Sequence, residues 1–271
     1  MKVALCAIAK LENHYIREWV EHYKHIGFDA IYLYDNNEPD GERFEEVIED
    51  YMRCGFVHVI DFRGRKVCQL AAYNDCYKRF GHKYDWMAFF DIDEFLTILN
   101  PYYKRDVKRF LDSWLYDDFD IIKICWQCMT DSGLLTADGN YSVKRFTQVS
   151  NPAAGCANNR NAKCICRTNK PLVWKRSVHV PDGERWSICD ATGTQTNARN
   201  GFEKPIWREA VIKHYRFKTI EEYITTKMQR LYPDQEPEQA AQKLDLNFFF
   251  KVNERTPEKE ELAAKLLKQY K

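Results

Sequence analysis

The sequence has little net charge, no long hydrophobic run and no repeat, and each absence excludes a class of protein. Its 41 Lys and Arg residues nearly balance 40 Asp and Glu residues, so the net charge of +1 provides no overall field for binding nucleic acid. No apolar stretch approaches the roughly 20 residues that span a bilayer. Repeat and low-complexity architectures are excluded too, because the sequence shows no internal repeat and no biased segment.

The N-terminal residues do not have the pattern of an export signal. The apolar stretch over residues 1–10 ends at charged residues without a cleavage-type spacer, so it is interpreted as a buried first strand. The ten cysteines are then expected as thiols in a reducing compartment, with the cytoplasm as the location. Cys125 and Cys128 have a spacing found in zinc sites, as do Cys164 and Cys166. Alternation along a strand would place Cys125 and Cys128 on opposite faces, which argues against zinc.

Strand and helix patterns alternate over the first 95 residues. Strands are predicted at 2–9, 30–34, 57–62 and 86–91, and helices at 13–26, 44–52 and 67–80. This order predicts an α/β fold with a mostly parallel central sheet and flanking helices, in which ligands bind at the carboxyl ends of the strands. Beyond Pro101 the patterns predict an added mixed-sheet region, with a helix near 104–116 and strands near 120–129, 141–149, 162–167 and 172–179.

The chain is expected to divide into a domain at 1–217 and a helical C-terminal extension at 218–271. Prolines at 233, 237 and 257 interrupt this extension. Leucines among lysines at helical spacing near residues 262–267 predict an amphipathic end that packs on the domain. Peripheral contact with an anionic membrane at its inner face is the alternative.

A wholly apolar predicted strand runs directly into three carboxylates, those of Asp91, Asp93 and Glu94. A core would not tolerate them, so the chain is expected to surface there into a site. Period-two alternation would put Asp91 and Asp93 on the same side, where two hard oxygen ligands suit Mg²⁺ or Mn²⁺. A second D-x-D triplet, at residues 118–120, lacks this context and is interpreted as a solvated turn.

Polar residues follow other strands as well. Asp35 and Asn36 end the second strand, where they would bind the base or ribose of a nucleotide; a simple turn cap is the alternative. Arg65 and Gln69 stand at the entry to the third helix, where they would meet a diphosphate or base.

These motifs, taken in order, resemble glycosyltransferase families 2 and 92. The resemblance rests on residues 5–10, Trp19, residues 32–36, 40–41, Gln69, Ala72, Asn74, Cys76 and residues 89–95, and further on Trp126, residues 132–133, 144–146, 163–167, 178–179 and 214–215. It covers roughly residues 3–230. The chain departs from the group's usual pattern at Lys144 and at residues 129–131.

The resemblance implies a GT-A fold, a nucleoside-diphosphate sugar donor, an Mn²⁺ or Mg²⁺ ion and inversion at the anomeric carbon. It further implies a role in surface polysaccharide synthesis with a glycan or lipid-linked acceptor. Among the residues, it implies nucleotide-sugar contacts at Asn74 and Asp91, and His214 as a metal ligand beside Asp91 and Asp93. A core histidine is the alternative for His214.

Transfer would also need a carboxylate that takes the proton from an attacking hydroxyl. Asp131, in a loop after an apolar strand, is the first candidate, and Asp182 and Glu94 are the alternatives. A turn-forming Asp before Ser-Gly is the competing interpretation of Asp131.

Two other functions remain open at this point. A non-catalytic nucleotide- or carbohydrate-binding module would be expected to have lost a metal carboxylate, yet Asp91, Asp93 and His214 are all present. A sugar-nucleotidyltransferase would need a glycine-rich phosphate loop after the first strand, and residues 7–12 contain no glycine.

Overall fold

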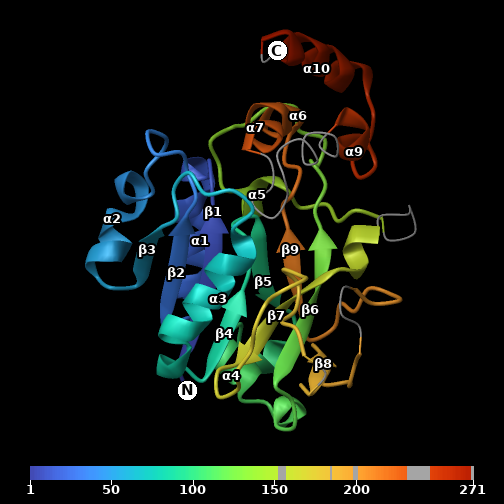
Figure 1. The fold of residues 1–271 in the computed structure, drawn as a ribbon. Helices are drawn as coiled ribbons and strands as arrows, with labels where there is room; N and C mark the ends of the chain where they lie inside the picture. Colours follow the sequence, from blue (N-terminus) through green and yellow to red (C-terminus); the bar gives the residue numbers. More distant parts are fainter. Residues whose placement is uncertain (152–156, 184, 198–200, 231–244, 270–271) are drawn as a thin grey trace.

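One nine-stranded sheet runs through the computed structural model, which describes residues 1–151, 157–183, 185–197, 201–230 and 245–269 (Figure 1). The strand order is β3-β2-β1-β4-β7-β6-β9-β5, with β8 beside β6. The strands are β1 (Val3–Ala9), β2 (Ala30–Asp35), β3 (Val57–Asp61), β4 (Trp86–Phe89), β5 (Glu94–Ile98), β6 (Ile121–Cys128), β7 (Ala162–Arg167), β8 (Ile188–Asp190) and β9 (Ala210–His214).

The first four strands are parallel, and helices connect them. These helices are α1 (Asn13–His25), α2 (Glu45–Arg53) and α3 (Gln69–Phe80), with a short 3₁₀ turn at Gly81–Lys83 before β4. The carboxyl ends of β1, β2 and β4 therefore meet at one edge of the sheet. The predicted α/β fold, with a mostly parallel sheet followed by a mixed region, is confirmed.

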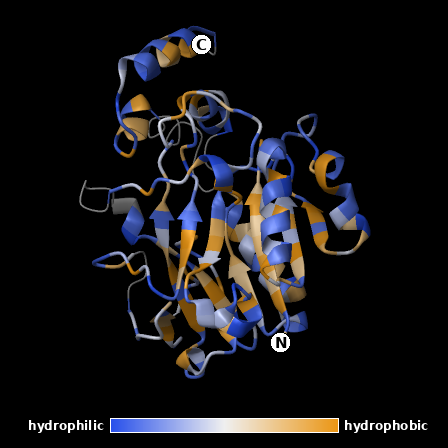
Figure 2. Cartoon of the chain, turned by 180° about the vertical axis from the view of Figure 1, so that it is seen from behind, coloured by the Kyte–Doolittle hydropathy of each residue, from blue (hydrophilic) through white to orange (hydrophobic). Residues whose placement is uncertain are grey.

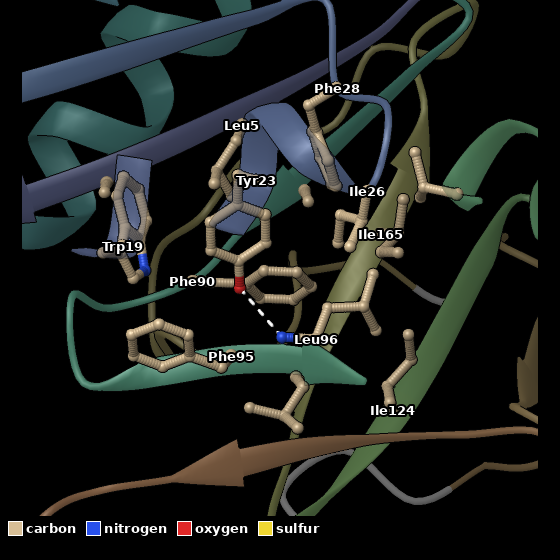
Figure 3. Packing of buried hydrophobic residues seen from close by; sticks show 14 of the residues in the cluster. Leu5, Trp19, Tyr23, Ile26, Phe28, Phe90, Phe95, Leu96, Ile124 and Ile165 are labelled. Atoms are coloured by element: carbon tan, nitrogen blue, oxygen red, sulfur yellow. Dashed lines mark hydrogen bonds between the residues drawn. The ribbon is translucent and has the colours of Figure 1, made fainter. Parts of the chain in front are cut away.

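The hydrophobic character of β1 explains why the sheet is covered on both faces. All seven of its residues are buried, and alternate side chains enter different clusters, with Leu5 and Ala7 on one face and Cys6 and Ile8 on the other. Figure 2 shows mainly hydrophobic strands between helices of mixed character. In the first cluster, Tyr23 of α1 packs near Phe90 and its hydroxyl accepts a hydrogen bond from the Leu96 amide at 3.1 Å (Figure 3).

The mixed half of the sheet corrects several expectations. β7 lies antiparallel between β4 and β6, and β9 joins β6 to β5. Residues 141–149 do not form the expected strand, because α5 (Ser142–Arg145) occupies the start of this range and only Val149 makes an isolated bridge. Residues 172–179 also lack a strand and contribute one bridge. The helix expected near 104–116 is a set of short pieces: Pro101–Tyr103, α4 (Val107–Leu111) and Trp114–Tyr116. A further 3₁₀ turn spans Ala157–Arg160.

The C-terminal helices lie above the edge of the sheet toward which β1 and β9 point (Figure 1). They are α6 (Ile220–Glu222), a π-helical turn (Tyr223–Lys227), α7 (Met228–Arg230), α9 (Leu246–Phe250) and α10 (Pro257–Gln269). Leu262, Leu266 and Leu267 of α10 pack on a separate apolar cluster, so this face of the amphipathic helix is in contact with protein. Pro233 and Pro237 lie outside the described residues.

Within the described ranges, no helix is both long and apolar enough to cross a membrane. The expected boundary at 217/218 stays a prediction, although Phe217 already belongs to the apolar cluster of the C-terminal helices.

Candidate functional site

The acidic segment lies in a turn between β4 and β5 rather than on a strand. β4 ends at Phe89, so the prediction that period-two alternation aligns Asp91 with Asp93 was wrong. The indole of Trp19 in α1 holds this turn by donating to the carbonyls of Asp91 at 3.0 Å and Glu94 at 3.1 Å. The turn therefore sits at the carboxyl edge of the sheet with its backbone fixed by α1.

Asp91 presents the most exposed carboxylate of the turn, with 33% of its side chain accessible. Its Oδ1 accepts hydrogen bonds from Gln69 Nε2 at 2.9 Å and from the Tyr73 hydroxyl at 3.4 Å. Its Oδ2 accepts from Lys163 Nζ at 2.9 Å. Side chains from α3 and β7 therefore orient Asp91, which keeps an accessible side for a ligand.

Asp93 is buried and faces three nitrogen donors. Its Oδ1 lies 3.3 Å from His214 Nε2, and its Oδ2 accepts from Lys227 Nζ at 2.7 Å and from Arg230 at 3.3 Å. Burial alone would raise the pKa of Asp93, but Lys227 and His214 hold this pKa well below its usual range. Asp93 is therefore an anion whose charge the structure already balances.

Positive charge gathers beside Asp93. A small cavity of about 10 Å³, with room for about one water, is lined by four cationic side chains: Arg216, Lys218, Lys227 and Arg230. Arg230 also pairs with Glu12, which follows β1. Glu12 also lines the cavity, whose size admits no anion larger than a water molecule as the side chains stand.

The three predicted metal ligands separate into two environments. Asp93 and His214 face each other, whereas Asp91 lies with Gln69 and Lys163. Within the described part of the chain, no group of three or more His, Cys, Asp or Glu side chains could hold a metal ion as the side chains stand. His214 Nδ1 is buried without a hydrogen-bond partner, and the ring packs against Trp126 with centroids 4.3 Å apart. Asp93 and His214 together supply an oxygen and a nitrogen that fit Mn²⁺, once Lys227 and Arg230 move aside.

The predicted nucleotide residues at the end of β2 are well supplied with partners. Asp35 Oδ2 pairs with Arg63 at 2.7 Å, and its Oδ1 accepts from the Asn37 backbone and side chain. Asn36 donates to the carbonyls of Phe62 and Arg65, which fixes the connection from β3 to α3. Both residues shape this strand end, and direct contact with a nucleotide remains a prediction.

The other two predicted contacts are Arg65, which precedes α3, and Asn74, which lies within it. The guanidinium of Arg65 lies 4.1 Å from the ring centroid of Phe62. Asn74 makes two hydrogen bonds to the Trp174 backbone, donating to its carbonyl at 2.7 Å and accepting from its amide at 2.8 Å. Asn74 thereby fastens the segment after β7 to α3.

The candidate bases Asp131 and Asp182 each close a loop. Asp131 is 2% exposed, accepts from the Gly133 amide and pairs with Lys259 of α10 at 2.6 Å. Asp182 accepts from the backbone amides of Lys175 and Arg176 at 2.7 and 3.0 Å and also pairs with the Arg176 guanidinium. Burial would raise the pKa of Asp182, but Arg176 lowers it.

Glu94, the third candidate, is fully buried. Its Oε2 accepts from the Asp91 amide at 2.8 Å, its Oε1 has no hydrogen-bond partner, and burial raises its pKa well above the usual range. Removing a general base would lower the rate by about 10²–10⁴-fold. We expect Glu94→Gln to retain most of the transfer rate, because its amide oxygen still accepts from Asp91. A kcat measurement checks this, and a loss within the general-base range would make Glu94 the base instead.

Three cationic partners of the acidic turn were missing from the predicted site: Lys163, Lys227 and Arg230. Lys163 is 1% exposed, and the three residues that follow it in β7 are apolar. A lysine in such a strand is the signal that could have indicated a buried acidic partner. For Lys227 and Arg230, the helical pattern alone gives no signal.

A larger cavity of about 390 Å³ opens next to Asp91. It is lined by Val67, Gln69, Leu70, Asn161, Arg176, Ser177, Val178 and His179. Gln69 connects it to the acidic turn through its hydrogen bond to Asp91. The size is within the range of ligand pockets, about 300–1,000 Å³.

The sequence profile of glycosyltransferase family 92 matches residues 3–248. The chain belongs to glycosyltransferase family 92. This membership confirms the resemblance and supports a glycosyltransferase over a nucleotidyltransferase. The matched residues 3–248 extend across the predicted domain boundary at 217/218.

Curated relatives of the family 92 chain come from plants. A family 92 protein of Oryza sativa subsp. japonica is 28% identical over 107 residues, which is 40% of this chain and 18% of that protein. One of Ricinus communis is 29% identical over 99 residues, 36% of this chain and 17% of that protein. One of Arabidopsis thaliana is 31% identical over 98 residues, 35% and 16% respectively. The chain thus aligns with less than a fifth of the length of these relatives.

Solved structures show weaker similarity. Staphylococcus aureus TarS 1–349 in complex with UDP-GlcNAc has a TM-score of 0.46 and 12% identity, over 100% of this chain and 80% of TarS 1–349. The mannosyltransferase PcManGT of Pyrobaculum calidifontis, in complex with GDP-Man and Mn²⁺, has a TM-score of 0.33 and 8% identity, over 45% of this chain and 35% of PcManGT.

Proposed function

We propose that this family 92 glycosyltransferase transfers a sugar from a nucleoside-diphosphate sugar, with inversion, in a reaction that depends on Mn²⁺ or Mg²⁺. The observation that carries the proposal is that two aspartates lie at the carboxyl edge of the parallel sheet, Asp91 paired with Lys163 and Asp93 beside a cationic cluster. Open α/β sheets bind ligands at this edge. Asp35 and Asn36 lie at the end of β2, so the base and ribose would lie on that side of Asp91.

In the proposed reaction, Asp93 and His214 would hold the divalent cation, and Asp91 is the third predicted ligand. The cation would neutralise charge that develops on the leaving diphosphate. Lys227 and Arg230 balance Asp93 in the absence of donor, and they would turn toward the phosphates when the donor enters. Lys163 keeps Asp91 oriented throughout, since it is buried beneath that carboxylate.

A second means of charge neutralisation is favoured by the same contacts. Because Lys227 and Arg230 already neutralise Asp93, these side chains and their neighbours Arg216 and Lys218 are able to bind a diphosphate without metal. Transfer that continues in excess EDTA would favour this alternative.

Asp131 remains our proposed base, and Asp182 the alternative. Asp131 would need to be freed from Lys259 before it takes a proton, because the lysine Nζ lies 2.6 Å from its Oδ2. A glycan or lipid-linked acceptor, surface polysaccharide synthesis and a cytoplasmic or peripheral membrane location also remain proposals.

A thermal-shift panel tests the donor and the metal together. We expect one nucleoside-diphosphate sugar to raise the melting temperature with Mn²⁺, because a ligand at 100 times its Kd stabilises the native state by about 2.7 kcal/mol. The panel would include UDP-N-acetylglucosamine and GDP-mannose, each with Mn²⁺ and with EDTA. A non-catalytic module would also shift but would release no diphosphate. No shift with any donor would contradict the proposal.

A further inference from the structure

The cavity of about 390 Å³ differs in charge from the cluster at Asp93. Among the described residues that line it, Arg176 is the one that carries a charge, and Asp182 already pairs with that guanidinium. The remaining lining combines amide, hydroxyl and imidazole groups with apolar side chains from Val67, Leu70 and Val178. Such a wall suits a neutral, hydroxyl-rich ligand better than a phosphate.

The position of the cavity in the strand order indicates whether it would bind the donor sugar or the acceptor. Among the predicted nucleotide contacts, Asp35 and Asn36 lie at the end of β2, whereas Gln69 itself lines the cavity. The opposite wall comes from the other side of β4, because Asn161 precedes β7 and the loop at 175–182 follows it. β4 and Asp91 lie between these two sides of the sheet. A molecule bound to the wall formed by Asn161 and His179 would therefore approach Asp91 from the side opposite Asp35 and Asn36, which is the direction required of an attacking acceptor.

The walls of the cavity are fixed before any ligand binds. Asn74 ties Trp174 to α3, and Asp182 closes the loop by accepting from the amides of Lys175 and Arg176. Val67, at the rim, has a left-handed backbone with φ of 46°. For a β-branched residue this conformation costs about 1–3 kcal/mol and is typical of functional sites.

His179 is oriented by two contacts within this wall. Its Nδ1 lies 2.8 Å from the Ala162 carbonyl, and its ring centroid is 5.3 Å from that of Trp126. A carbonyl can only accept, so Nδ1 carries the proton and the neutral ring has a lone pair on Nε2. Burial lowers the pKa of His179 to about 4, which keeps the ring neutral. No described residue bonds to Nε2.

We propose that this cavity is the acceptor subsite and binds a neutral sugar, one of whose hydroxyls donates a hydrogen bond to His179 Nε2. The assignment rests on the proposed transferase function. His179 positions the acceptor here, and the proton is still taken by a carboxylate.

Two isosteric variants separate the nitrogens of His179. Asn places an amide N–H near the position of Nδ1, so His179→Asn keeps the bond to Ala162 and loses the Nε2 acceptor. Gln reaches farther, so His179→Gln restores an acceptor near Nε2 and loses the Ala162 bond. If His179 is only structural, His179→Asn should impair stimulation by the acceptor less than His179→Gln does. If His179 binds the acceptor, His179→Gln should be the less harmful of the two.

The assay measures nucleoside diphosphate release from UDP-N-acetylglucosamine and GDP-mannose, with water alone and with p-nitrophenyl glycosides of glucose, galactose, mannose and N-acetylglucosamine. We expect one glycoside to stimulate release by the parent. The ratio of stimulated to water-driven release should fall at least about tenfold in His179→Asn, the scale of one lost hydrogen bond, and stay near the parent value in His179→Gln. Leu70→Trp, which would fill the cavity from α3, should also lower this ratio.

The outcomes distinguish the two proposals. If the parent releases no diphosphate from either donor or from the wider panel of nucleotide sugars, the proposed function fails. Release without stimulation by any glycoside overturns the acceptor subsite alone. The subsite is equally overturned if His179→Asn, shown to be folded by its melting curve, is stimulated as strongly as the parent. Asp118→Asn, at an exposed turn, is the matched control and should match the parent in every assay.

Discussion

Asp93→Asn is expected to lower the transfer rate by about 100-fold or more, the scale found when one group that stabilises transition-state charge is removed. Asn retains the size of the side chain but not the charge that would hold a divalent cation. Lys227 and Arg230 would also lose the carboxylate that balances them. Leaving a largely buried charge unpaired costs about 3–5 kcal/mol, so the variant should also melt earlier than the parent.

Activity and stability must therefore be measured on the same preparations. kcat is determined well below the melting temperature, across an Mn²⁺ titration, for Asp93→Asn and for the second D-x-D variant Asp118→Asn. The control should match the parent, because Asp118 is exposed in a turn before β6. An Asp93→Asn protein that is folded, fully active and unchanged in its Mn²⁺ response would eliminate Asp93 as a metal ligand.

The parallel half of this fold could be predicted because each of its strands and helices has a hydrophobic pattern within its own segment of sequence. β1, β2 and β4 consist of residues that are buried throughout, and α1 buries one apolar stripe that includes Ile16 and Trp19. Such segments reveal their structure through hydrophobic spacing alone. The same reasoning located the acidic turn, because carboxylates after an apolar strand need a site.

The mixed half depends on contacts that no local pattern contains. Residues 141–149 alternate like a strand, but the amides of Ser142 and Val143 donate to the Glu18 carboxylate and Arg145 pairs with Glu222. These contacts fix a helical turn instead. Similarly, β5 pairs in register with β9, so that Glu94 lies opposite His214 on a strand far along the chain.

The site was predictable in its carboxylates but not in its cations. Lys163 is 72 positions from Asp91 in the sequence, and Lys227 and Arg230 are 134 and 137 positions from Asp93. Charge pairs at such separations arise from strand order and helix docking, which one sequence does not specify. The sequence therefore predicted an open metal site, whereas the structure holds both aspartates in ion pairs.

Lys163→Met is expected to destabilise the protein, by less than the roughly 3–5 kcal/mol lost when a fully buried ion pair is broken, because 33% of the Asp91 side chain is accessible to water. Lys163 Nζ lies 2.9 Å from Asp91 Oδ2 and 3.8 Å from Glu94 Oε2. Burial alone would lower the pKa of Lys163, but Asp91 and Glu94 raise it well above its usual range. Met fills similar space without the charge. Because Asp91 would lose one of its three orienting contacts, transfer should fall as well.

Lys123→Met is the matched control, since Lys123 is a buried lysine on the neighbouring strand β6. Burial lowers the pKa of Lys123 to about 8, which means that removing this charge from water disfavours its charged form. Lys123 Nζ lies 5.0 Å from the ring centroid of Phe202, so replacing Lys123 with Met should lower the free energy of unfolding by less than Lys163→Met does. Urea denaturation of both variants and the parent, with m-values compared, measures the difference.

A double-mutant cycle then attributes the loss to the pair itself. If the unpaired Asp91 carboxylate causes the destabilisation of Lys163→Met, adding Asp91→Asn should recover most of the lost stability, because no charge is left without its partner. Activity should stay low in the double variant, since Asp91 is part of the proposed donor site. Simple addition of the two single effects would instead mean that Lys163 stabilises the fold through packing, and the ion pair would no longer explain how Asp91 is held.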